Sequence, residues 1–503
     1  MAVRLKRNIV WSYVNWAVSI AVPLVMIPIY LRCLGRETYG AWVVILSITG
    51  YLSLANLGIG QTLGNRVAEA VARERRDEIG PLISTAFFGY AAIAAALMAA
   101  LVVFTPVIAN RLALGASAKV IAPFFIYVVL TLMSFPFKVF PMVLRAFERV
   151  DQEQAITSVT NVVRIAALAL ALLSGFKLEA VAAVNGGAEI LLPMAAYWQS
   201  RRLTREVRPR LTMFSRALLR DMVQPSLGFL GIQVANTLIS GVDALVIGYS
   251  LGASAVPAYS VPFRVTTMLV GLLSVAVIAV NPSVTVNYAQ GTRNALARGY
   301  LFSLRISTLY GTAGAIALWV IGPAFFRVWA GAGVFPGYRA YALMLMMFVM
   351  VVLIMPASSI LWATTRHYVW SLMSLGEGAL NLALSLWWVR RFGLTGVIGA
   401  TVTASALLTF WYLPYAALKT LEIPIRDALR ELAPGFALSA AALGAVALLW
   451  SAHLDASLLY SLGWGTAAVL AYTVAFARLG FSRSQRQRAV GWISASRRQE
   501  SAA

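Results

Sequence analysis

The sequence predicts an all-α membrane protein with many transmembrane helices, and three observations lead to this class. Of the 503 residues, 60% are hydrophobic and only 12% are charged, whereas soluble domains are about 45–50% apolar and about 25% charged. The mean hydropathy is +0.78. Apolar runs of about 20 residues, the length with which an α-helix crosses a bilayer, follow one another with basic clusters between them.

The apolar runs predict about fourteen transmembrane helices and leave no room for a sizeable soluble domain. The expected crossings are 9–31, 40–60, 82–105, 119–142, 155–175, 179–200, 224–249, 258–282, 297–320, 339–362, 368–389, 396–417, 432–451 and 458–478. The runs are about twice the length of a membrane β-strand and do not alternate, which disfavours a barrel. The first run is long enough to span and has no small-residue cleavage site, so we interpret it as a retained crossing.

The basic residues alternate between the two sides of the expected membrane. Most of them fall in one set of connections, which begins with Arg4 and Lys6, includes Lys138 and ends in the tail after residue 480. By the positive-inside rule this set is cytoplasmic, and both termini with it. The net charge of +22 is therefore mostly a topology signal that also favours contact with anionic lipids. A nucleic-acid binder would instead gather its charge on a soluble face, so we expect no nucleic-acid partner.

Internal similarity predicts two related halves. The segment LGRETYGAW begins at Leu34, and a similar segment, LGASAVPAY, begins at Leu251. A second pair, KLEAVAA from Lys177 and GLTGVIGA from Gly393, has nearly the same separation. Two matches at one spacing indicate two six-helix lobes followed by an additional helix pair.

The domain boundaries follow from this repeat and from the charge clusters. We expect an N-terminal six-helix lobe at 1–200, a basic cytoplasmic linker at 201–223, a C-terminal six-helix lobe at 224–420, an extra helix pair at 421–480 and a basic cytoplasmic tail at 481–503. Within the linker, Leu211, Phe214, Leu218 and Met222 form one stripe. The stripe predicts a short interfacial helix, with a solvated linker as the alternative.

Three segments carry a resemblance to a known family. YLRCLGRETYGAWVVILSITGYLSLANLGIG at 30–60 resembles the opening of the polysaccharide-biosynthesis flippases, which belong to the superfamily of multidrug, oligosaccharidyl-lipid and polysaccharide exporters. SGVDALVIGYSLGASAVPAYSVPFR at 240–264 is similar to the start of their second half, and FGLTGVIGATVTASAL at 392–407 to their twelfth crossing. The resemblance covers about 5–420. It implies two lobes around a central cleft and the movement of lipid-linked oligosaccharides across the bacterial inner membrane.

Six charged residues lie deep inside the expected crossings, away from their ends, where each costs at least about 2.5–3.5 kcal/mol unless it has a partner or faces water. They are Arg164, Glu189, Asp243, Arg264, Arg305 and Glu377. The three arginines are candidates for binding a diphosphate, because a guanidinium makes bidentate contacts with phosphate oxygens. Arg264 is the first candidate, because the resemblance implies a basic residue in this part of the second lobe.

The alternative role for these charges is structural. Ion pairs such as Arg164–Glu189 and Asp243–Arg264 would tie neighbouring helices together. Asp243, Glu189 and Glu377 are candidates for such pairs or for coupling transport to a proton or sodium gradient. For Asp243 we favour pairing.

Uncharged polar residues in the crossings have the same two interpretations. Asn15, Asn56, Asn161, Asn185 and Asn236 are able to contact sugar hydroxyls. The commoner role of such side chains is to bridge helices by hydrogen bonds.

The predicted function is therefore a flippase that moves a polyprenyl-diphosphate oligosaccharide for lipopolysaccharide or exopolysaccharide synthesis. Its expected partners are this substrate, anionic lipids, and the polysaccharide polymerase and chain-length machinery. We predict no cofactor and no metal, because the chain has one cysteine, Cys33, and two histidines, His367 and His453.

Two other functions stay open. A proton- or sodium-coupled drug antiporter of the same superfamily would need an accessible acidic cluster. A glycosyltransferase or ligase would need carboxylates on an outer loop, and the outer acids are only Glu37, Glu179 and Asp455. We therefore expect a transporter and not an enzyme.

Overall fold

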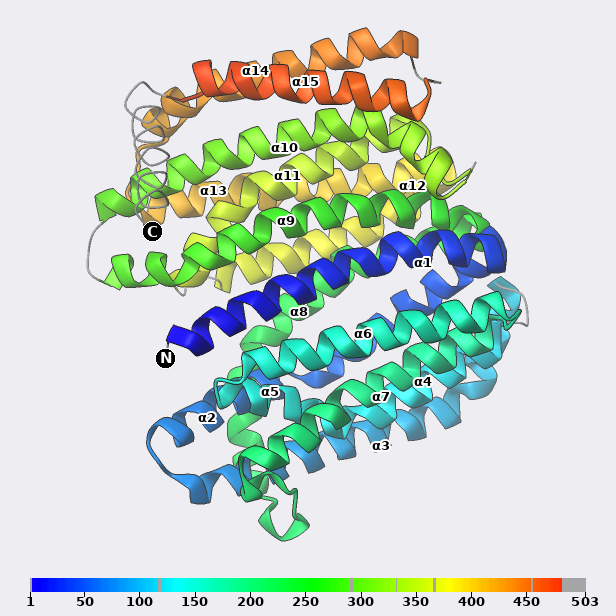
Figure 1. The fold of residues 1–503 in the computed structure, drawn as a ribbon, viewed down its shortest axis with the longest axis vertical. Helices are drawn as coiled ribbons and strands as arrows, with labels where there is room; N and C mark the ends of the chain where they lie inside the picture. The colour runs from blue at the N-terminus through cyan, green and yellow to red at the C-terminus, as the bar shows by residue number, and fades with distance from the viewer. Residues whose placement is uncertain are drawn as a thin grey trace. The chain divides into compact units, whose positions relative to one another are not determined.

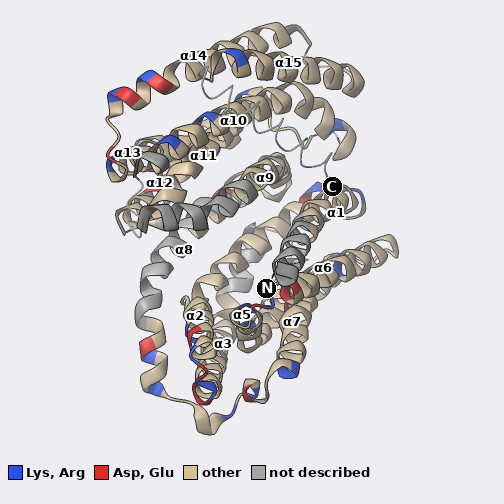
Figure 2. Ribbon diagram, turned by 60° about the vertical axis from the view of Figure 1, so that its left-hand side comes forward, with Lys and Arg blue, Asp and Glu red and all other residues tan. Residues whose placement is uncertain are grey.

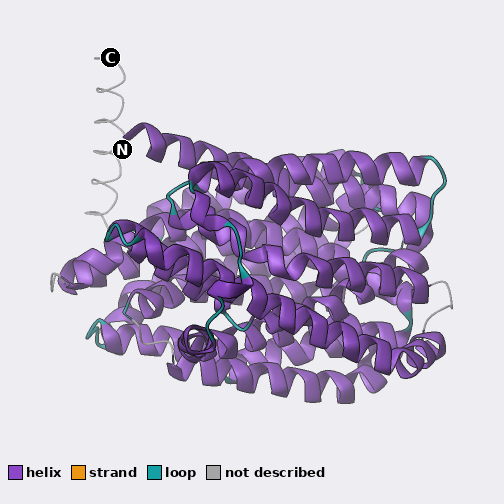
Figure 3. Cartoon of the chain, turned by 90° about the horizontal axis from the view of Figure 1, so that it is seen from below, coloured by secondary structure: helices purple, strands orange, loops and turns teal. Residues whose placement is uncertain are grey.

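The chain consists of long helices joined by short connections (Figures 1 and 3). The computed structural model describes residues 2–115, 120–289, 293–331, 333–364, 368–453 and 456–481, and within these ranges every regular element is helical. Eleven of the described helices are long and apolar enough to cross a membrane. Charged residues lie mostly near helix ends and connections (Figure 2). The predicted class, an all-α polytopic membrane protein, is confirmed.

The expected crossings can be matched to the observed spans. Ala17–Asn56 contains the first two expected crossings, and Val369–Thr420 contains the eleventh and twelfth. The seventh corresponds to α8, whose end, Gly241–Leu251, is a shorter apolar helix. The chain is therefore a multi-pass membrane protein whose helices follow the predicted order.

Contacts divide the chain into two compact units, Met1–Ser260 and Val261–Ala503. The first contains α1 (Ala2–Gly50), α2 (Ile59–Ala72), α3 (Arg76–Gly115), α4 (Ile121–Ser134), α5 (Val139–Ala146), α6 (Val150–Leu173), α7 (Leu178–Leu203) and α8 (Arg216–Leu251). The second contains most of α9 (Val256–Ala289), then α10 (Arg293–Trp329), α11 (Tyr338–Ala363), α12 (Tyr368–Leu407), α13 (Thr409–Thr420), α14 (Ile425–Trp450) and α15 (Leu458–Leu479). Contacts thus group α8 with the first unit, whereas the sequence-based division assigns it to the second lobe.

The sequence repeat is visible in the backbone. Gly35 interrupts α1 with φ 79° and ψ 169°, and Gly252, the matching residue, ends α8 with φ 88° and ψ 159°. Glycine is favoured at both places because other residues rarely adopt this conformation. The aromatic residues that follow, Trp42 and Tyr259, are 2% and 3% exposed. The two segments are therefore similar in local backbone conformation as well as in amino-acid sequence.

Two crossings of the first unit are interrupted near one another. After the 3-10 turn Tyr51–Asn56, Leu57 and Gly58 both take left-handed conformations before α2 begins. The fourth crossing changes from α4 to the 3-10 turn Phe135–Lys138, with Pro136 near its start, and continues as α5. Because α2 and α5 pack together, the two interruptions contribute to one wall of a cavity.

The segment after α7 differs from the interfacial helix expected in the linker. It forms the 3-10 turns Arg205–Val207 and Leu211–Met213, and α8 begins only at Arg216. Its main chain is held by α3, because the buried hydroxyls of Ser84 and Thr85 accept hydrogen bonds from the N–H groups of Arg210 and Ser215. These bonds place the linker against protein, and the apolar stripe does not form one continuous helix.

In the second unit α10 is central, since it packs against α11, α14 and α15. Phe476 and Tyr472 of α15 cluster with the buried Ile316 of α10. The helix pair α14–α15 expected after residue 420 is therefore part of this unit's core. The expected basic tail lies outside the described residues, apart from Phe481.

Candidate functional site

A cavity of about 410 Å³ lies within the first unit. Its volume is in the range of small-ligand sites, about 300–1,000 Å³. Its lining comes from the two interrupted crossings and from α3, α6, α7 and α8. The lining residues are Ser53, Leu54, Asn56, Leu57, Gly58, Gly60, Gln61, Tyr90, Lys138, Pro141, Met142, Thr160, Asn161, Arg164, Ala188, Glu189, Leu192, Pro193 and Gln233. We refer to it as the N-terminal cavity.

Two cations and one carboxylate line the N-terminal cavity. They are Lys138 at the end of the 3-10 turn, Arg164 on α6 and Glu189 on α7. The Lys138 ammonium lies 4.5 Å from the ring centre of Phe135, which is a cation–π distance. The Arg164 Nε is buried and has no hydrogen-bond partner among the described residues. The lining therefore has an excess positive charge and an unused donor.

The sequence makes Arg164 a candidate for binding the ligand, and it makes Arg164 and Glu189 candidates for an ion pair with each other. The structure places both side chains on the same cavity. Neither is found in an ion pair with a described residue. Arg164 is thus placed where an anion entering the cavity can meet its guanidinium.

Arg305 has a different environment. Its side chain is 5% exposed and lies on α10, where Nη1 is 3.1 Å from a carboxylate oxygen of Glu431 and Nη2 donates to the Glu431 main-chain carbonyl at 2.8 Å. Both contacts reach α14. This arrangement favours the structural alternative for Arg305.

Asp243 and Arg264 belong to different units. Asp243 is 1% exposed on α8 and accepts a hydrogen bond from the Tyr259 hydroxyl at 2.9 Å. Arg264 is exposed on α9. Their pairing stays a prediction.

Glu377 lies in a buried polar cluster of the second unit. It is 6% exposed on α12 and accepts a hydrogen bond from the Thr409 hydroxyl of α13. One turn further on, Asn381 accepts hydrogen bonds from Ser385 and Thr401. Among the described residues Glu377 has hydroxyl partners and no ion pair.

Sequence reasoning missed Lys138 and Tyr90. Lys138 was counted with the basic residues that mark membrane sidedness, although it lies four positions inside the expected 119–142 crossing, between Pro136 and Pro141. The prolines are the signal that an interruption there turns the lysine inward. Tyr90 carried no signal, since one tyrosine in an apolar helix is ordinary.

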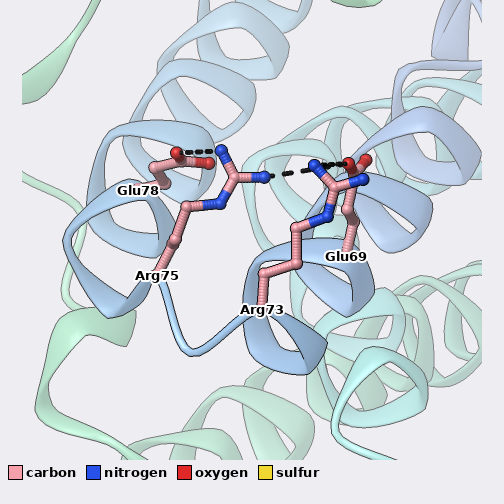
Figure 4. A network of polar contacts seen from close by, with 4 residues as sticks. All are labelled: Glu69, Arg73, Arg75 and Glu78. Carbon is pink, nitrogen blue, oxygen red and sulfur yellow. Dashed lines mark hydrogen bonds and ion pairs between the residues drawn. The ribbon is translucent and has the colours of Figure 1, made fainter.

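A network of ion pairs lies at the connection of α2 and α3 (Figure 4). Arg73 pairs with Glu69 at 3.0 Å, and Arg75 joins Glu69 at 3.7 Å to Glu78 at 2.7 Å. These side chains are 42–63% exposed. Because these charges pair with one another, the network stabilises the turn and offers no unpaired charge to a ligand. The N-terminal cavity is therefore the candidate site. No group of three possible metal-ligating side chains occurs among the described residues.

Comparisons with known proteins agree with this architecture. The sequence profile of the family described as "Polysaccharide biosynthesis protein" matches residues 5–285. No curated protein matches the chain.

Solved structures share the fold at low identity. The lipid II flippase MurJ in an inward closed conformation has a TM-score of 0.69 at 15% identity, covering 93% of this chain and 99% of that one. An inward-facing multidrug resistance MATE family transporter of the MOP superfamily has a TM-score of 0.61 at 15% identity, covering 84% and 99%. A MOP superfamily transporter from Pyrococcus furiosus, described as having a binding pocket of reverse polarity, has a TM-score of 0.57 at 15% identity, covering 83% and 96%. The profile match covers more than half of the sequence, and the chain belongs to the polysaccharide biosynthesis protein family.

Proposed function

We propose that this protein is a flippase, and not an enzyme, that moves a polyprenyl-diphosphate-linked oligosaccharide from the cytoplasmic to the outer leaflet of the bacterial inner membrane. The observation that carries the proposal is the N-terminal cavity, in which Lys138 and the unpartnered Arg164 Nε face one space. A diphosphate is the anionic part of such a substrate. Membership of the polysaccharide biosynthesis family and a fold shared with a lipid II flippase support the same substrate class.

In the proposed mechanism the diphosphate binds to Lys138 and Arg164. Arginine offers a planar fork for two phosphate oxygens, whereas lysine acts as a point charge. Glu189 lines the same cavity, and its electrostatic interaction with Lys138 gives the lysine a counter-charge before substrate arrives. Alternating access of the two lobes then exposes the bound headgroup to the other side, while the lipid tail stays in the bilayer. Arg264 is proposed as a further contact from the second lobe.

The proposed setting follows from the charge distribution of the sequence. Both termini are cytoplasmic, with the basic connections against anionic headgroups. The product would pass to polysaccharide polymerase and chain-length machinery on the outer side. A cationic drug is a poorer fit to the N-terminal cavity, because two cations face it against one carboxylate.

The decisive experiment removes, one at a time, the two cations of the N-terminal cavity and Arg264, the further proposed contact. Lys138→Ala, Arg164→Ala and Arg264→Ala are tested for complementation of a surface-glycan flippase deletion and for flipping of a polyprenyl-diphosphate oligosaccharide in proteoliposomes. Each lost hydrogen bond to a charged group is worth about 1.5–3 kcal/mol, which corresponds to roughly a 10- to 100-fold loss.

The matched control is Lys177→Ala, because Lys177 is an exposed lysine at the start of α7 and lies outside the cavity lining. It should transport at the parental rate. Parental transport by well-expressed Lys138→Ala and Arg164→Ala variants would overturn the proposal for the cavity. Parental transport by the Arg264→Ala variant would remove only Arg264 from the proposed binding site.

Coupling to an ion gradient is a separate proposal for Glu377. Its carboxylate is held by a Thr409 hydroxyl in the described structure, an arrangement that permits protonation or exchange of a cation. Glu377→Gln keeps the hydrogen-bonding shape but removes the charge. We expect flipping by this variant to lose its dependence on a proton or sodium gradient. A rate that still rises with the gradient would assign coupling to another group, with Asp243 the next candidate.

A further inference from the structure

The membrane-embedded asparagines separate into two groups in the structure. Asn185 donates to the Val181 carbonyl of its own helix at 2.8 Å, and Asn15 accepts from the Ser158 hydroxyl of α6 at 3.4 Å. Asn56 and Asn161 instead line the N-terminal cavity. The side chain of Asn236 lies outside the described residues. The first group fits the common role of bridging or capping, and the second group requires another explanation.

Asn56 is the clearest case. Its side-chain oxygen is buried and has no hydrogen-bond partner among the described residues. A buried polar atom without a partner costs about 1–3 kcal/mol, so such atoms are normally satisfied by water or a ligand. Gln61, one turn away across the interruption, and Asn161 on α6 line the same space. With Gln233 of α8, which donates to the Ser53 hydroxyl at 3.4 Å, four carboxamides therefore line one cavity.

Tyr90 fixes the part of this wall that comes from the interrupted crossing. Its hydroxyl accepts a hydrogen bond from the Gly60 N–H at 2.9 Å and is 3.3 Å from the Asn56 carbonyl, to which it donates. These groups lie on opposite sides of the left-handed pair Leu57–Gly58. Tyr90 itself is 2% exposed. One rigid side chain thus ties together the two ends of the break that carry Asn56 and Gln61.

We propose that Asn56, Gln61 and Asn161 form a sugar-binding wall in the N-terminal cavity, and that Tyr90 is its positioning residue. This inference rests on the proposed function, because the sugar meant is the one attached to the diphosphate. A carboxamide both donates and accepts hydrogen bonds, as sugar hydroxyl and N-acyl groups require. The cations Lys138 and Arg164 take the phosphates, and the uncharged wall selects the sugar.

The test compares probes with and without a sugar. Purified protein is titrated with a short prenyl diphosphate and with the same lipid carrying glucose, galactose or N-acetylglucosamine. We expect at least one sugar-bearing probe to bind about tenfold more tightly than the sugar-free lipid, which is near the upper value of one neutral hydrogen bond. Asn56→Leu and Asn161→Leu should each remove most of this preference, measured in each variant as the ratio of its affinities for the sugar-bearing and the sugar-free lipid.

Tyr90→Phe tests the positioning role, since it removes only the hydroxyl. It should reduce the sugar preference severalfold, and a purely structural tyrosine would not change that ratio. Asn185→Leu is the matched control, because it removes an asparagine that is bonded within its helix, and the sugar preference should persist.

Two failures can be told apart. If no sugar-bearing probe binds more tightly than the sugar-free lipid, or if the preference survives in both Asn56→Leu and Asn161→Leu, the sugar-binding wall is wrong. The proposed flippase function then still stands on the lysine and arginine variants. If the sugar-free lipid binds equally well to the parent and to Lys138→Ala and Arg164→Ala variants, the proposed function itself has failed.

Discussion

Gly40 of α1 lies directly against the main-chain carbonyl of Ala253. A methyl group on Gly40 would overlap the Ala253 carbonyl oxygen and would be 3.2 Å from Cδ of Pro257. Gly40 belongs to the first copy of the sequence repeat, and Ala253 and Pro257 belong to the second. The two copies therefore pack on one another inside the first unit, and glycine is required because of this close approach.

Gly40→Ala should destabilise the protein. Overpacking of a tight contact typically costs about 1–3 kcal/mol, and the opposing atom here belongs to the main chain and cannot rotate away. Thermal unfolding in detergent measures the effect. Gly50→Ala is the control on the same helix, because nothing lies within 4 Å of the added methyl group. Equal stability of the two variants would contradict the contact.

Arg305→Met should lower stability and leave substrate affinity unchanged. The substitution removes two contacts to Glu431 from a buried guanidinium, and hydrogen bonds to charged groups are worth about 1.5–3 kcal/mol. Arg298→Met, at an exposed position of the same helix, should change neither quantity. If the Arg305→Met protein were stable but bound substrate more weakly, Arg305 would have a role in substrate binding.

Gly322 and Tyr341 should show strong energetic coupling. A methyl group on Gly322 would overlap the Tyr341 hydroxyl, which donates to the Leu318 carbonyl at 2.8 Å. Gly322→Ala and Tyr341→Phe should each destabilise the protein. Together they should cost less than their sum by about 0.5–3 kcal/mol, because Phe removes the overlapping atom. Additive costs in this double-mutant cycle would contradict the packing.

The network at the α2–α3 connection should contribute little. Glu69→Gln removes two exposed ion pairs, and such pairs are worth about 0–1 kcal/mol each. We expect a small drop in the unfolding temperature in dilute buffer that disappears near 1 M salt, where the screening length is about 3 Å. A large, salt-independent loss would mean that the network does more than fix the turn.

The crossings were predictable because hydrophobic length is a local property of the chain. The repeat was predictable as well, and its glycines, Gly35 and Gly252, adopt nearly the same backbone conformation. The positions of the helix breaks were harder to predict. Pro136 does stand at an interruption, whereas in α1 the non-helical residue is Gly35 and not Pro23 or Pro28. Proline is tolerated within membrane helices, so its presence alone does not locate a break.

The site was only partly predictable, because the direction in which a side chain points depends on how the helices pack. Arg164 and Glu189 were expected from their depth in the membrane, and both line the N-terminal cavity. Lys138 was assigned to the membrane surface because counting charges by loop ignores the turn at Phe135–Lys138. The left-handed Leu57, which helps to place Asn56 and Gln61, is unpredictable from sequence because leucine seldom adopts that conformation.

The ion pair between Arg305 and Glu431 also bears on the role of α14 and α15, which follow the two predicted six-helix lobes. Truncation after residue 420 would expose the apolar face of α10 to acyl chains, which are as good a solvent for that face as α14 and α15. The guanidinium of Arg305 would lose its two contacts with Glu431, and acyl chains offer no group that replaces them. A shortened protein should therefore insert less well, and Arg305→Leu in the truncated chain should restore part of its insertion.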